Sequence, residues 1–230
     1  MPAVLAILAA GSSSRAGVDK VLADLGGHPV LAWSLQAAQV AGCFGEIIIV
    51  VPAEKIAAVT AALQPRAGVR VIAGGATRTA SSWAALDASG NADVIAVHDA
   101  ARPFVPPSLF QRCVEIAGAE GSAVAGLPLA DTVRRANEAG AAREEIERDG
   151  LWAAQTPQAF RRDVLAKARA AAGDRSFSDD AAAVVAAGLS VRMVPGERRN
   201  LKITTLEDLG YARELVAKGL VGLAAWQIAR

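Results

Sequence analysis

The chain has 230 residues, is 53% hydrophobic and carries a formal net charge of +1 at pH 7. A charge this close to zero excludes the broad basic field of typical nucleic-acid-binding proteins, so any anion site must be local. The two cysteines, Cys43 and Cys113, lie far apart and lack metal-ligand spacing. No disulfide framework is expected, and a reducing cytoplasm is the expected location. The apolar run that ends at Gly11 is too short to cross a bilayer, so we expect a soluble protein without membrane partners.

Short apolar runs alternate with stretches of helical periodicity along the first half of the chain. Strands are expected at residues 4–8, 46–51, 69–72, 93–97 and 122–127. Helices are expected between them, at residues 31–40, 53–63, 77–88 and 107–117. The strands are apolar on both faces, which predicts a mostly parallel sheet covered by helices on both sides. The predicted fold class is therefore α/β, with a Rossmann-like sheet.

Residues 131–150, DTVRRANEAGAAREEIERDG, interrupt this alternation with a polar, charge-dense segment. The segment is expected to be a solvated hairpin or an excursion that meets a partner subunit. Alternation then resumes, with helices at 161–172, 179–187 and 205–218 and short strands at 191–194 and 201–203. Thr204 or Thr205 is the expected N-cap of the last helix. Because no linker or repeat is present, the sequence predicts one domain over residues 1–230 with an inserted arm.

Ligands of an open α/β sheet bind outside the carboxyl ends of its strands, and four stretches leave strands at that edge. The first, LAAGSSSRAGVDK, lacks two glycines of the dinucleotide fingerprint and the Gly-Lys-Ser/Thr of a Walker A loop. Its small residues and its two cations, Arg15 and Lys20, suit an anion such as a triphosphate. An ordinary turn with surface cations is an equally good interpretation of this stretch alone.

The second stretch, AGGATRTASS, combines Gly74 and Gly75, which permit close backbone approach, with several hydroxyls around Arg78. A turn followed by a helix cap is the alternative. In the third stretch, VHDAARPF, Asp99 could bind a sugar hydroxyl or a cation, and Arg102 could bind a phosphate. A helix or turn cap is the alternative for Asp99, and His98 is expected to be a packed, hydrogen-bonded histidine rather than a catalyst. The fourth stretch covers residues 127–132.

Further candidates lie later in the chain, and each is weak alone: Arg148, Thr156, Ser178 with Asp179 and Asp180, Lys202 and Thr204. Together with the four stretches they resemble a known family, the 2-C-methyl-D-erythritol 4-phosphate cytidylyltransferases. The resemblance is carried, in order along the chain, by LAAGSSSRAGVDK, AGGATRTASS, VHDAARPF, LADTVRR, ERDGLWAAQTPQAF, SDDAA and NLKITTLEDL.

The resemblance implies attack of the acceptor's phosphate oxygen on the α-phosphorus of CTP, with Mg²⁺ assistance. Positioning and charge neutralisation are the protein's main tasks in such a transfer. The implied catalytic residues are Arg15, Lys20, Arg148 and Lys202. The implied CTP-binding residues are Ala9, Ala10, Gly11, Gly75, Ala76, Ser81, Asp99 and Ala100. The implied binding residues for methylerythritol phosphate are Asp99, Arg102, Thr132, Arg148, Thr156, Lys202 and Thr204. The metal ligands stay unknown.

The resemblance also implies a homodimer in which the arm at 131–150 crosses to the partner, so that Arg148 acts in the neighbouring site. Two alternatives stay open. A ribitol-5-phosphate cytidylyltransferase would have the same fold and nucleotide, but DAAR and RDGLW favour the methylerythritol substrate. An inactive nucleotide-binding relative is supported by Ser13, where the family usually has Gly, and by Asp19, where it has Pro. A Rossmann-type oxidoreductase fits the fold class but not the missing glycines.

Overall fold

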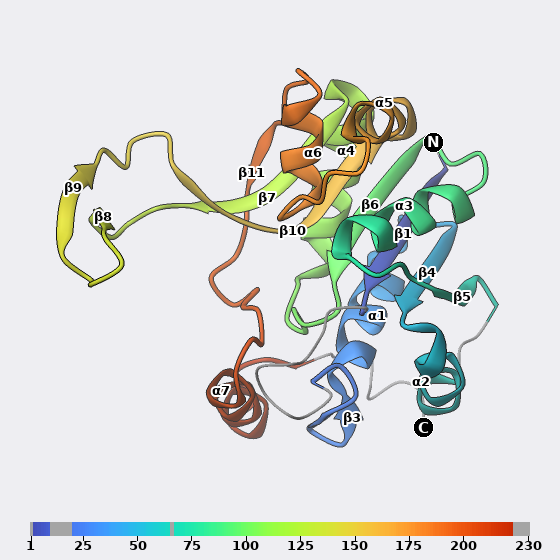
Figure 1. The fold of residues 1–230 in the computed structure, drawn as a ribbon. Helices are drawn as coiled ribbons and strands as arrows, with labels where there is room; N and C mark the ends of the chain where they lie inside the picture. The colour runs from blue at the N-terminus through green and yellow to red at the C-terminus, as the bar shows by residue number, and fades with distance from the viewer. Residues whose placement is uncertain (1, 10–19, 65–66, 223–230) are drawn as a thin grey trace.

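A computed structural model describes residues 2–9, 20–64 and 67–222, and its centre is a seven-stranded sheet (Figure 1). The strands of this sheet are β1 (Ala3–Leu8), β4 (Glu46–Val51), β5 (Val69–Ala73), β6 (Val94–Asp99), β7 (Ser122–Pro128), β10 (Trp152–Arg161) and β11 (Met193–Pro195). Their order is β11-β7-β10-β6-β1-β4-β5. Every neighbouring pair is parallel except the two that contain β10, which is antiparallel to β6 and to β7.

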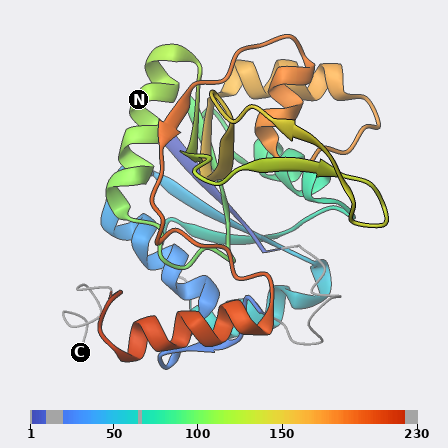
Figure 2. The same cartoon turned by 90° about the vertical axis from the view of Figure 1, so that its left-hand side faces the viewer.

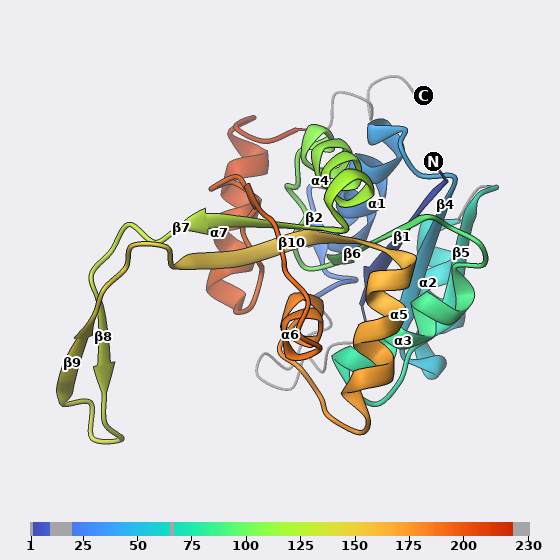
Figure 3. The same ribbon diagram turned by 90° about the horizontal axis from the view of Figure 1, so that it is seen from above.

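Helices cover both faces of the sheet, as the sequence predicts. They are α1 (Val30–Ala41), α2 (Ile56–Leu63), α3 (Arg78–Ala88), α4 (Pro107–Glu120), α5 (Arg162–Ala172), α6 (Asp180–Ala186) and α7 (Leu206–Ala217), with a short 3-10 turn, η1 (Ala53–Lys55), before α2. Residues of α1, α2 and α4 share one core cluster, and residues of α3, α5 and α6 share the other. Figure 3 shows α1 and α4 separated from α3, α5 and α6 by the sheet.

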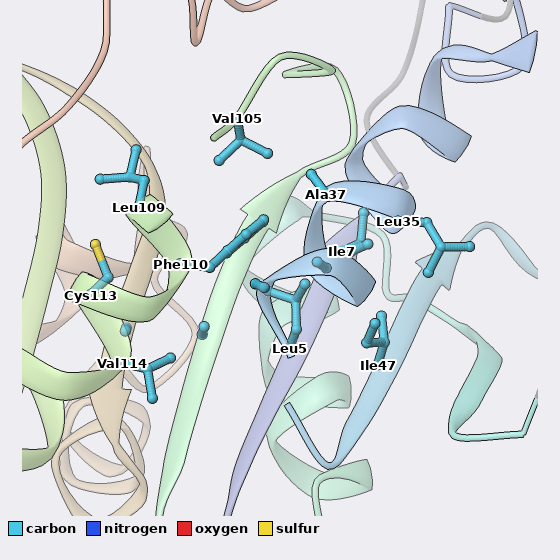
Figure 4. Packing of buried hydrophobic residues seen from close by; sticks show 14 of the residues in the cluster. Leu5, Ile7, Leu35, Ala37, Ile47, Val105, Leu109, Phe110, Cys113 and Val114 are labelled. Atoms are coloured by element: carbon cyan, nitrogen blue, oxygen red, sulfur yellow. The ribbon is translucent and has the colours of Figure 1, made fainter. Parts of the chain in front are cut away.

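The strands contribute to both clusters because successive side chains of a strand point to opposite faces. In β1, Leu5 and Ile7 pack against the α1 side, and Val4, Ala6 and Leu8 pack against the α3 side. Figure 4 shows Leu5 and Ile7 beside residues of α1 and α4. The two-sided burial explains why these strands are continuous apolar runs in the sequence.

The last helix, α7, packs at one end of the molecule against a small hairpin of β2 (Asp24–Leu25) and β3 (His28–Pro29) (Figure 2). The hairpin turns through Gly26 and Gly27, whose φ angles of 65° and 84° favour glycine. Leu25, Trp33 and Leu209 belong to a third core cluster that joins this end to α1. Thr205 caps α7 with a capping box that includes Asp208.

The segment at 131–150 forms the expected hairpin, made of β8 (Val133–Ala136) and β9 (Ala142–Ile146) in antiparallel pairing. The hairpin projects from the body of the protein in Figures 1 and 3, well away from the main sheet. Two cross-strand ion pairs, Arg134–Glu145 at 3.1 Å and Arg135–Glu144 at 3.4 Å, connect its strands. All four side chains are more than half exposed, from 55% to 69%.

Three features of the fold differ from the sequence prediction. The ten-residue strand β10 and the β2–β3 hairpin were not predicted. The predicted strand at 201–203 is wrong, because these residues have no strand conformation. Ile203 is instead buried in the third core cluster, and its N–H donates to the Ala101 carbonyl at 2.8 Å. None of the helices in the described ranges has the length and apolar character needed to span a bilayer.

Candidate active site

The carboxyl ends of β1 and β6 lie side by side and bring two of the predicted stretches together. Ala9 follows β1, and its N–H donates to the carbonyl of Val50 at 2.8 Å. Ala100 follows β6, and its N–H donates to the carbonyl of Leu8 at 3.0 Å. Both alanines are buried, at 4% and 0% exposed, so their backbone forms a fixed floor at this edge of the sheet.

Asp99, the last residue of β6, is the centre of a cluster of charged side chains. Its Oδ2 lies 2.7 Å from Lys202 Nζ, its Oδ1 lies 3.4 Å from Arg78 Nη2, and Arg102 Nε lies 4.0 Å from Oδ2. Burial alone would raise the pKa of Asp99, but the cations Arg78, Lys202 and Arg102 outweigh burial and lower it to about 2. Asp99 is therefore an anion at neutral pH and holds three cations at one point.

Arg78, the first residue of α3, joins Asp99 to a second carboxylate. Its Nη1 lies 2.8 Å from Oδ2 of Asp180, whose side chain is only 2% exposed. Burial acts to lower the pKa of Arg78, but Asp180 and Asp99 raise it above its usual value. Asp179 also acts on Arg78, so the cations Arg78, Arg102 and Lys202 lie among three carboxylates. Cations gathered at a ligand-binding edge can bind an anionic ligand.

The guanidinium of Arg102 faces Asp99 and makes one hydrogen bond among the described residues. Its Nη1 donates to the carbonyl of Asn200 at 2.8 Å, while its Nε is buried without a hydrogen-bond partner among the described residues. Burial, the largest influence, lowers the pKa of Arg102, and Asp99 opposes this shift. Arginine remains charged in proteins, and its planar fork matches phosphate oxygens. Arg102 is thus positioned and charged as a phosphate ligand should be.

The loop before α3 carries the predicted cytosine-binding residues. Gly75 and Ala76 are exposed at this edge of the sheet. A Cβ on Gly75 would come within 2.4 Å of Ala80 Cβ, so the close approach of the loop to α3 requires glycine here. Thr77 caps the helix by accepting from Ala80 N–H at 3.0 Å. The hydroxyl of Ser81 is fully buried and donates to Thr77 O at 2.9 Å, so in this structure Ser81 supports the loop.

Lys20 and Thr204 meet near Lys202, although they are far apart in the sequence. Nζ of Lys20 donates to the carbonyl of Thr204. The Thr204 hydroxyl donates to Oδ2 of Asp208 at 2.6 Å, and the same oxygen accepts from Thr205 N–H at 2.9 Å. Lys20 therefore contacts the segment that carries both Lys202 and Thr205, the N-cap of α7. Two predicted cations thus lie near the start of this helix.

Thr156, on β10, lies directly behind Asp99. Its side chain is 3% exposed, and its Oγ1 accepts from the Asp99 N–H at 3.0 Å. The same Oγ1 lies 3.0 Å from Nδ1 of His98. Thr156 is near the site, as predicted, but its hydroxyl already has two partners inside the protein.

Thr132 and Arg148 lie on the projecting arm, one just before β8 and the other just after β9. Both are exposed, and the Arg148 guanidinium donates to the carbonyl of Ala130. Within a single chain the arm does not lie at the Asp99 cluster, because it extends away from the body (Figure 1). Three other predicted site residues, Ala10, Gly11 and Arg15, lie outside the described residues.

The donor set around Asp99 fits a metal that binds together with phosphates. Within the described ranges, no group of three or more His, Cys, Asp or Glu side chains could hold a metal ion. Mg²⁺ is commonly held by one or two carboxylates together with substrate phosphates and water. Asp99 can supply such a carboxylate, so the residues fit a magnesium ion that is bound mainly by a nucleotide.

Sequence reasoning missed Arg78 as a site residue, although AGGATRTASS drew attention to its neighbours. The signal was an arginine at a helix start after two glycines, with the acidic pair Asp179 and Asp180 downstream. The paired carboxylate could be found only from the structure, because Asp180 follows 102 residues later in the chain. His98, expected as a packed histidine, is fully buried and hydrogen-bonded, which confirms that expectation.

Known proteins share both the sequence and the fold. Residues 3–218 match the sequence model of the family described as 2-C-methyl-D-erythritol 4-phosphate cytidylyltransferase. A protein of that name from Deinococcus radiodurans is 40% identical over 214 residues, which cover 91% of this chain and 87% of the relative. The bifunctional enzyme IspD/IspF of Anaeromyxobacter sp. strain Fw109-5 is 42% identical, and the match covers 93% of this chain and 57% of that protein. The chain thus spans little more than half the length of such bifunctional relatives.

Solved structures agree with this placement. The crystal structure of 2-C-methyl-D-erythritol 4-phosphate cytidylyltransferase from Thermus thermophilus has a TM-score of 0.78 and 34% sequence identity to this chain. The match covers 94% of this chain and 100% of the Thermus chain. A 4-diphosphocytidyl-2C-methyl-D-erythritol synthase from Anaerococcus prevotii has a TM-score of 0.82 and 25% identity, with 94% and 96% covered. By sequence and by fold, the chain belongs to the 2-C-methyl-D-erythritol 4-phosphate cytidylyltransferase family.

Proposed function

We propose that the chain transfers a cytidylyl group from CTP to 2-C-methyl-D-erythritol 4-phosphate. The products are 4-diphosphocytidyl-2-C-methyl-D-erythritol and pyrophosphate, in the non-mevalonate route to isoprenoid precursors. The observation that carries the proposal is the cationic cluster around Asp99, at the ligand-binding edge of a chain from this family. It is a cluster built for phosphates and without an evident covalent nucleophile.

The reaction needs one bond to form and one to break. A phosphate oxygen of the acceptor attacks the α-phosphorus of CTP, and the bond from the α-phosphorus to the bridging oxygen breaks as pyrophosphate leaves. The attacking phosphate is already ionised at neutral pH, so no strong general base is required. Negative charge builds on the leaving pyrophosphate, and preorganised cations stabilise it.

The nucleotide is assigned to the edge formed by β1, β5 and β6. Ala9, Ala10 and Gly11 are assigned to CTP, and Arg15 and Lys20 to its triphosphate, by the family resemblance. Gly75 and Ala76 meet the cytosine, with Ser81 supporting them from inside α3. Asp99 and Ala100 lie near the ribose. Mg²⁺, held by the triphosphate and Asp99, would supply further neutralisation of phosphate charge when bound.

The acceptor is assigned to the other side of Asp99. Arg102 lies beside Asp99 with one hydrogen bond from its guanidinium, and Lys202 is 42% exposed beside Asp99, so both are assigned to the acceptor's phosphate. Thr204, two residues after Lys202, is assigned to the same acceptor site. Asp99 keeps both cations in place until the ligand arrives, because its lowered pKa keeps it charged.

A second subunit is assigned to complete the acceptor site. Thr132 and Arg148 belong to an arm that lies away from its own chain's Asp99 cluster, in a domain that is otherwise closely packed (Figure 3). In a homodimer of two-fold symmetry each arm can reach the other subunit's site, and the two contacts are then equivalent. The arm would thereby serve as both a dimer contact and a source of catalytic cations.

Pyrophosphate release from CTP tests the proposal. We expect release with 2-C-methyl-D-erythritol 4-phosphate and Mg²⁺, none without an acceptor, and much less with ribitol 5-phosphate. Preferential use of ribitol 5-phosphate would move the chain to the other acceptor. Binding of CTP without release with either acceptor would mean that the chain is an inactive relative.

A further inference from the structure

A set of fully buried polar side chains lies behind the Asp99 cluster, and the proposed reaction does not use it directly. His98 and Asn200 are 0% exposed, and Thr156 is 3% exposed. They come from β6, from β10 and from the segment that precedes α7. Burying polar groups is costly unless they are hydrogen-bonded, so such a set requires a reason.

The hydrogen bonds of the His98 ring indicate which of its two nitrogens carries a hydrogen. Oγ1 of Thr156 accepts from the Asp99 N–H at 3.0 Å, so the hydroxyl hydrogen is free to donate to Nδ1 of His98, also at 3.0 Å. Nδ1 is then an acceptor and carries no hydrogen. The hydrogen on Nε2 can in turn donate to the carbonyl of Arg102 at 3.2 Å. Because the Arg102 carbonyl can only accept, the ring must carry a hydrogen on Nε2 to make this bond.

The surroundings of the ring also hold it in place. The side chain of His98 is fully buried. Phe110 of α4 packs edge-on against the ring, with centroids 5.1 Å apart and an interplanar angle of 69°. Hydrogen bonds at both ring nitrogens and the contact with Phe110 therefore hold the imidazole in place.

The chain of bonds joins the two ends of the turn that carries the site. Thr156 binds the N–H of Asp99, and His98 binds the carbonyl of Arg102. The turn itself closes with a bond from Arg102 N–H to Asp99 O at 3.0 Å. Asn200 extends the connection, because its Nδ2 donates to Thr156 O at 2.8 Å and its carbonyl accepts from the Arg102 guanidinium at 2.8 Å.

We infer that His98 and Thr156 are positioning residues that hold the Asp99–Arg102 turn in the geometry required for cytidylyl transfer. The inference rests on the proposed function for its link to catalysis. It gives Thr156 an internal role in place of the predicted contact with the acceptor, since its hydroxyl already has two partners inside the protein. Small displacements of aligned groups can cost about 100-fold in rate, so the turn's geometry matters.

The test compares Thr156→Val with Thr156→Ser and with a matched control. Valine has the shape of threonine without the hydroxyl. Ser122→Ala is the control, because the buried Ser122 hydroxyl also donates to a carbonyl (Ser190, 3.0 Å) and accepts a backbone N–H (Arg192, 3.2 Å), at the far end of β7. We expect Thr156→Val to lower kcat by about 10- to 100-fold, Thr156→Ser to restore most of it, and Ser122→Ala to leave kcat unchanged.

Two kinetic outcomes would overturn the inference. A rise in KM for the methylerythritol phosphate with kcat unchanged would restore Thr156 to acceptor binding. A loss of kcat in Ser122→Ala as large as in Thr156→Val, with a similar loss of Tm, would mean that any lost buried hydroxyl has this effect.

The protonation of the His98 ring can be measured by NMR without any enzymatic turnover. The sequence has two histidines, so ¹⁵N NMR of the wild type and of His28→Gln assigns the signals of His98. We expect a hydrogen on Nε2, because the bond to the Arg102 carbonyl requires it. A ring with no hydrogen on Nε2 would overturn the inference even if the chain were active. The expected tautomer in a chain without transferase activity would instead point to failure of the proposed function.

Discussion

The Asp99 cluster and the β8–β9 arm use charge in opposite ways. Around Asp99, charged side chains from β6, α3 and α6 meet in a buried setting, where Asp180 is 2% exposed and Arg102 is 11% exposed. In the arm, the cross-strand pairs are more than half exposed. Buried ion pairs constrain geometry strongly, whereas exposed pairs contribute little. The difference is that the body holds its charged side chains in one buried arrangement, whereas the arm leaves its charged side chains in solvent.

The largest expected effect is that of Lys20→Ala. Lys20 contacts the carbonyl of Thr204 and is the cation that we assign to the triphosphate among the described residues. Loss of a group that stabilises developing charge should lower kcat by about 100- to 1,000-fold while the fold survives. Steady-state kinetics and circular dichroism check both points. Lys218→Ala, at an exposed lysine paired with Glu214, is the control, and near-normal turnover of Lys20→Ala would show that another cation has this role.

Arg78→Met should have the next largest effect, on stability. It leaves Asp180, buried at 2% exposed, without its cation, so we expect the free energy of unfolding to fall by about 3 kcal/mol. Arg134→Met breaks an exposed pair of the arm and should cost less than about 0.5 kcal/mol. Chemical denaturation of both variants tests the contrast, and equal losses would remove the distinction between the two regions.

Arg148→Ala should weaken the use of the acceptor and leave the binding of CTP unchanged. Because Arg148 is assigned to the methylerythritol phosphate, we expect kcat/KM for the acceptor to fall by about 10- to 100-fold, with CTP affinity unchanged. Arg143→Ala, at an exposed arginine of β9, controls for a general change in the arm's charge. A change in CTP affinity alone would contradict the assignment of the arm.

Asp208→Ala should have the smallest effect, with a defined pH dependence. Hydrogen bonds from Thr204 and Thr205 lower the pKa of Asp208 from 3.8 to about 2, so its stabilising effect is present above pH 3.8 and is lost as the pH falls through about 2. At pH 7 the variant should be less stable by about 1 kcal/mol, as expected for a lost helix cap. Denaturation at decreasing pH should show the difference from wild type shrinking, and Glu207→Ala should show no such cap effect.

The parts of the fold that could be predicted from the sequence are those with strong local patterns. The apolar runs of β1, β4, β6 and β7 and the periodic helices were predicted because two-sided burial selects apolar residues. β10 was missed because its buried residues include Gln155, Thr156 and Gln158, which pair by hydrogen bonds and leave no apolar pattern. The strand at 201–203 was wrongly predicted because Ile203 is apolar for burial in the third core cluster with α7, without pairing in a sheet.

The candidate site shows the same division between local and distant information. Asp99, Arg102 and Lys202 could be chosen because each follows or precedes a recognisable element and because the family resemblance places them. Arg78 could not, since its importance comes from two carboxylates far from it in sequence. The internal role of Thr156 depends on the orientation of a hydroxyl, which no sequence pattern encodes.

Mixing Lys20→Ala with Arg148→Ala tests most directly whether each site combines one subunit's body with the other subunit's arm. In a mixed dimer one site carries both substitutions and the other carries neither. After equal mixing and subunit exchange, we expect about a quarter of wild-type turnover, although each variant alone is weak. Turnover that stays at the average of the two separate variants, in a mixture shown to contain mixed dimers, would contradict the account.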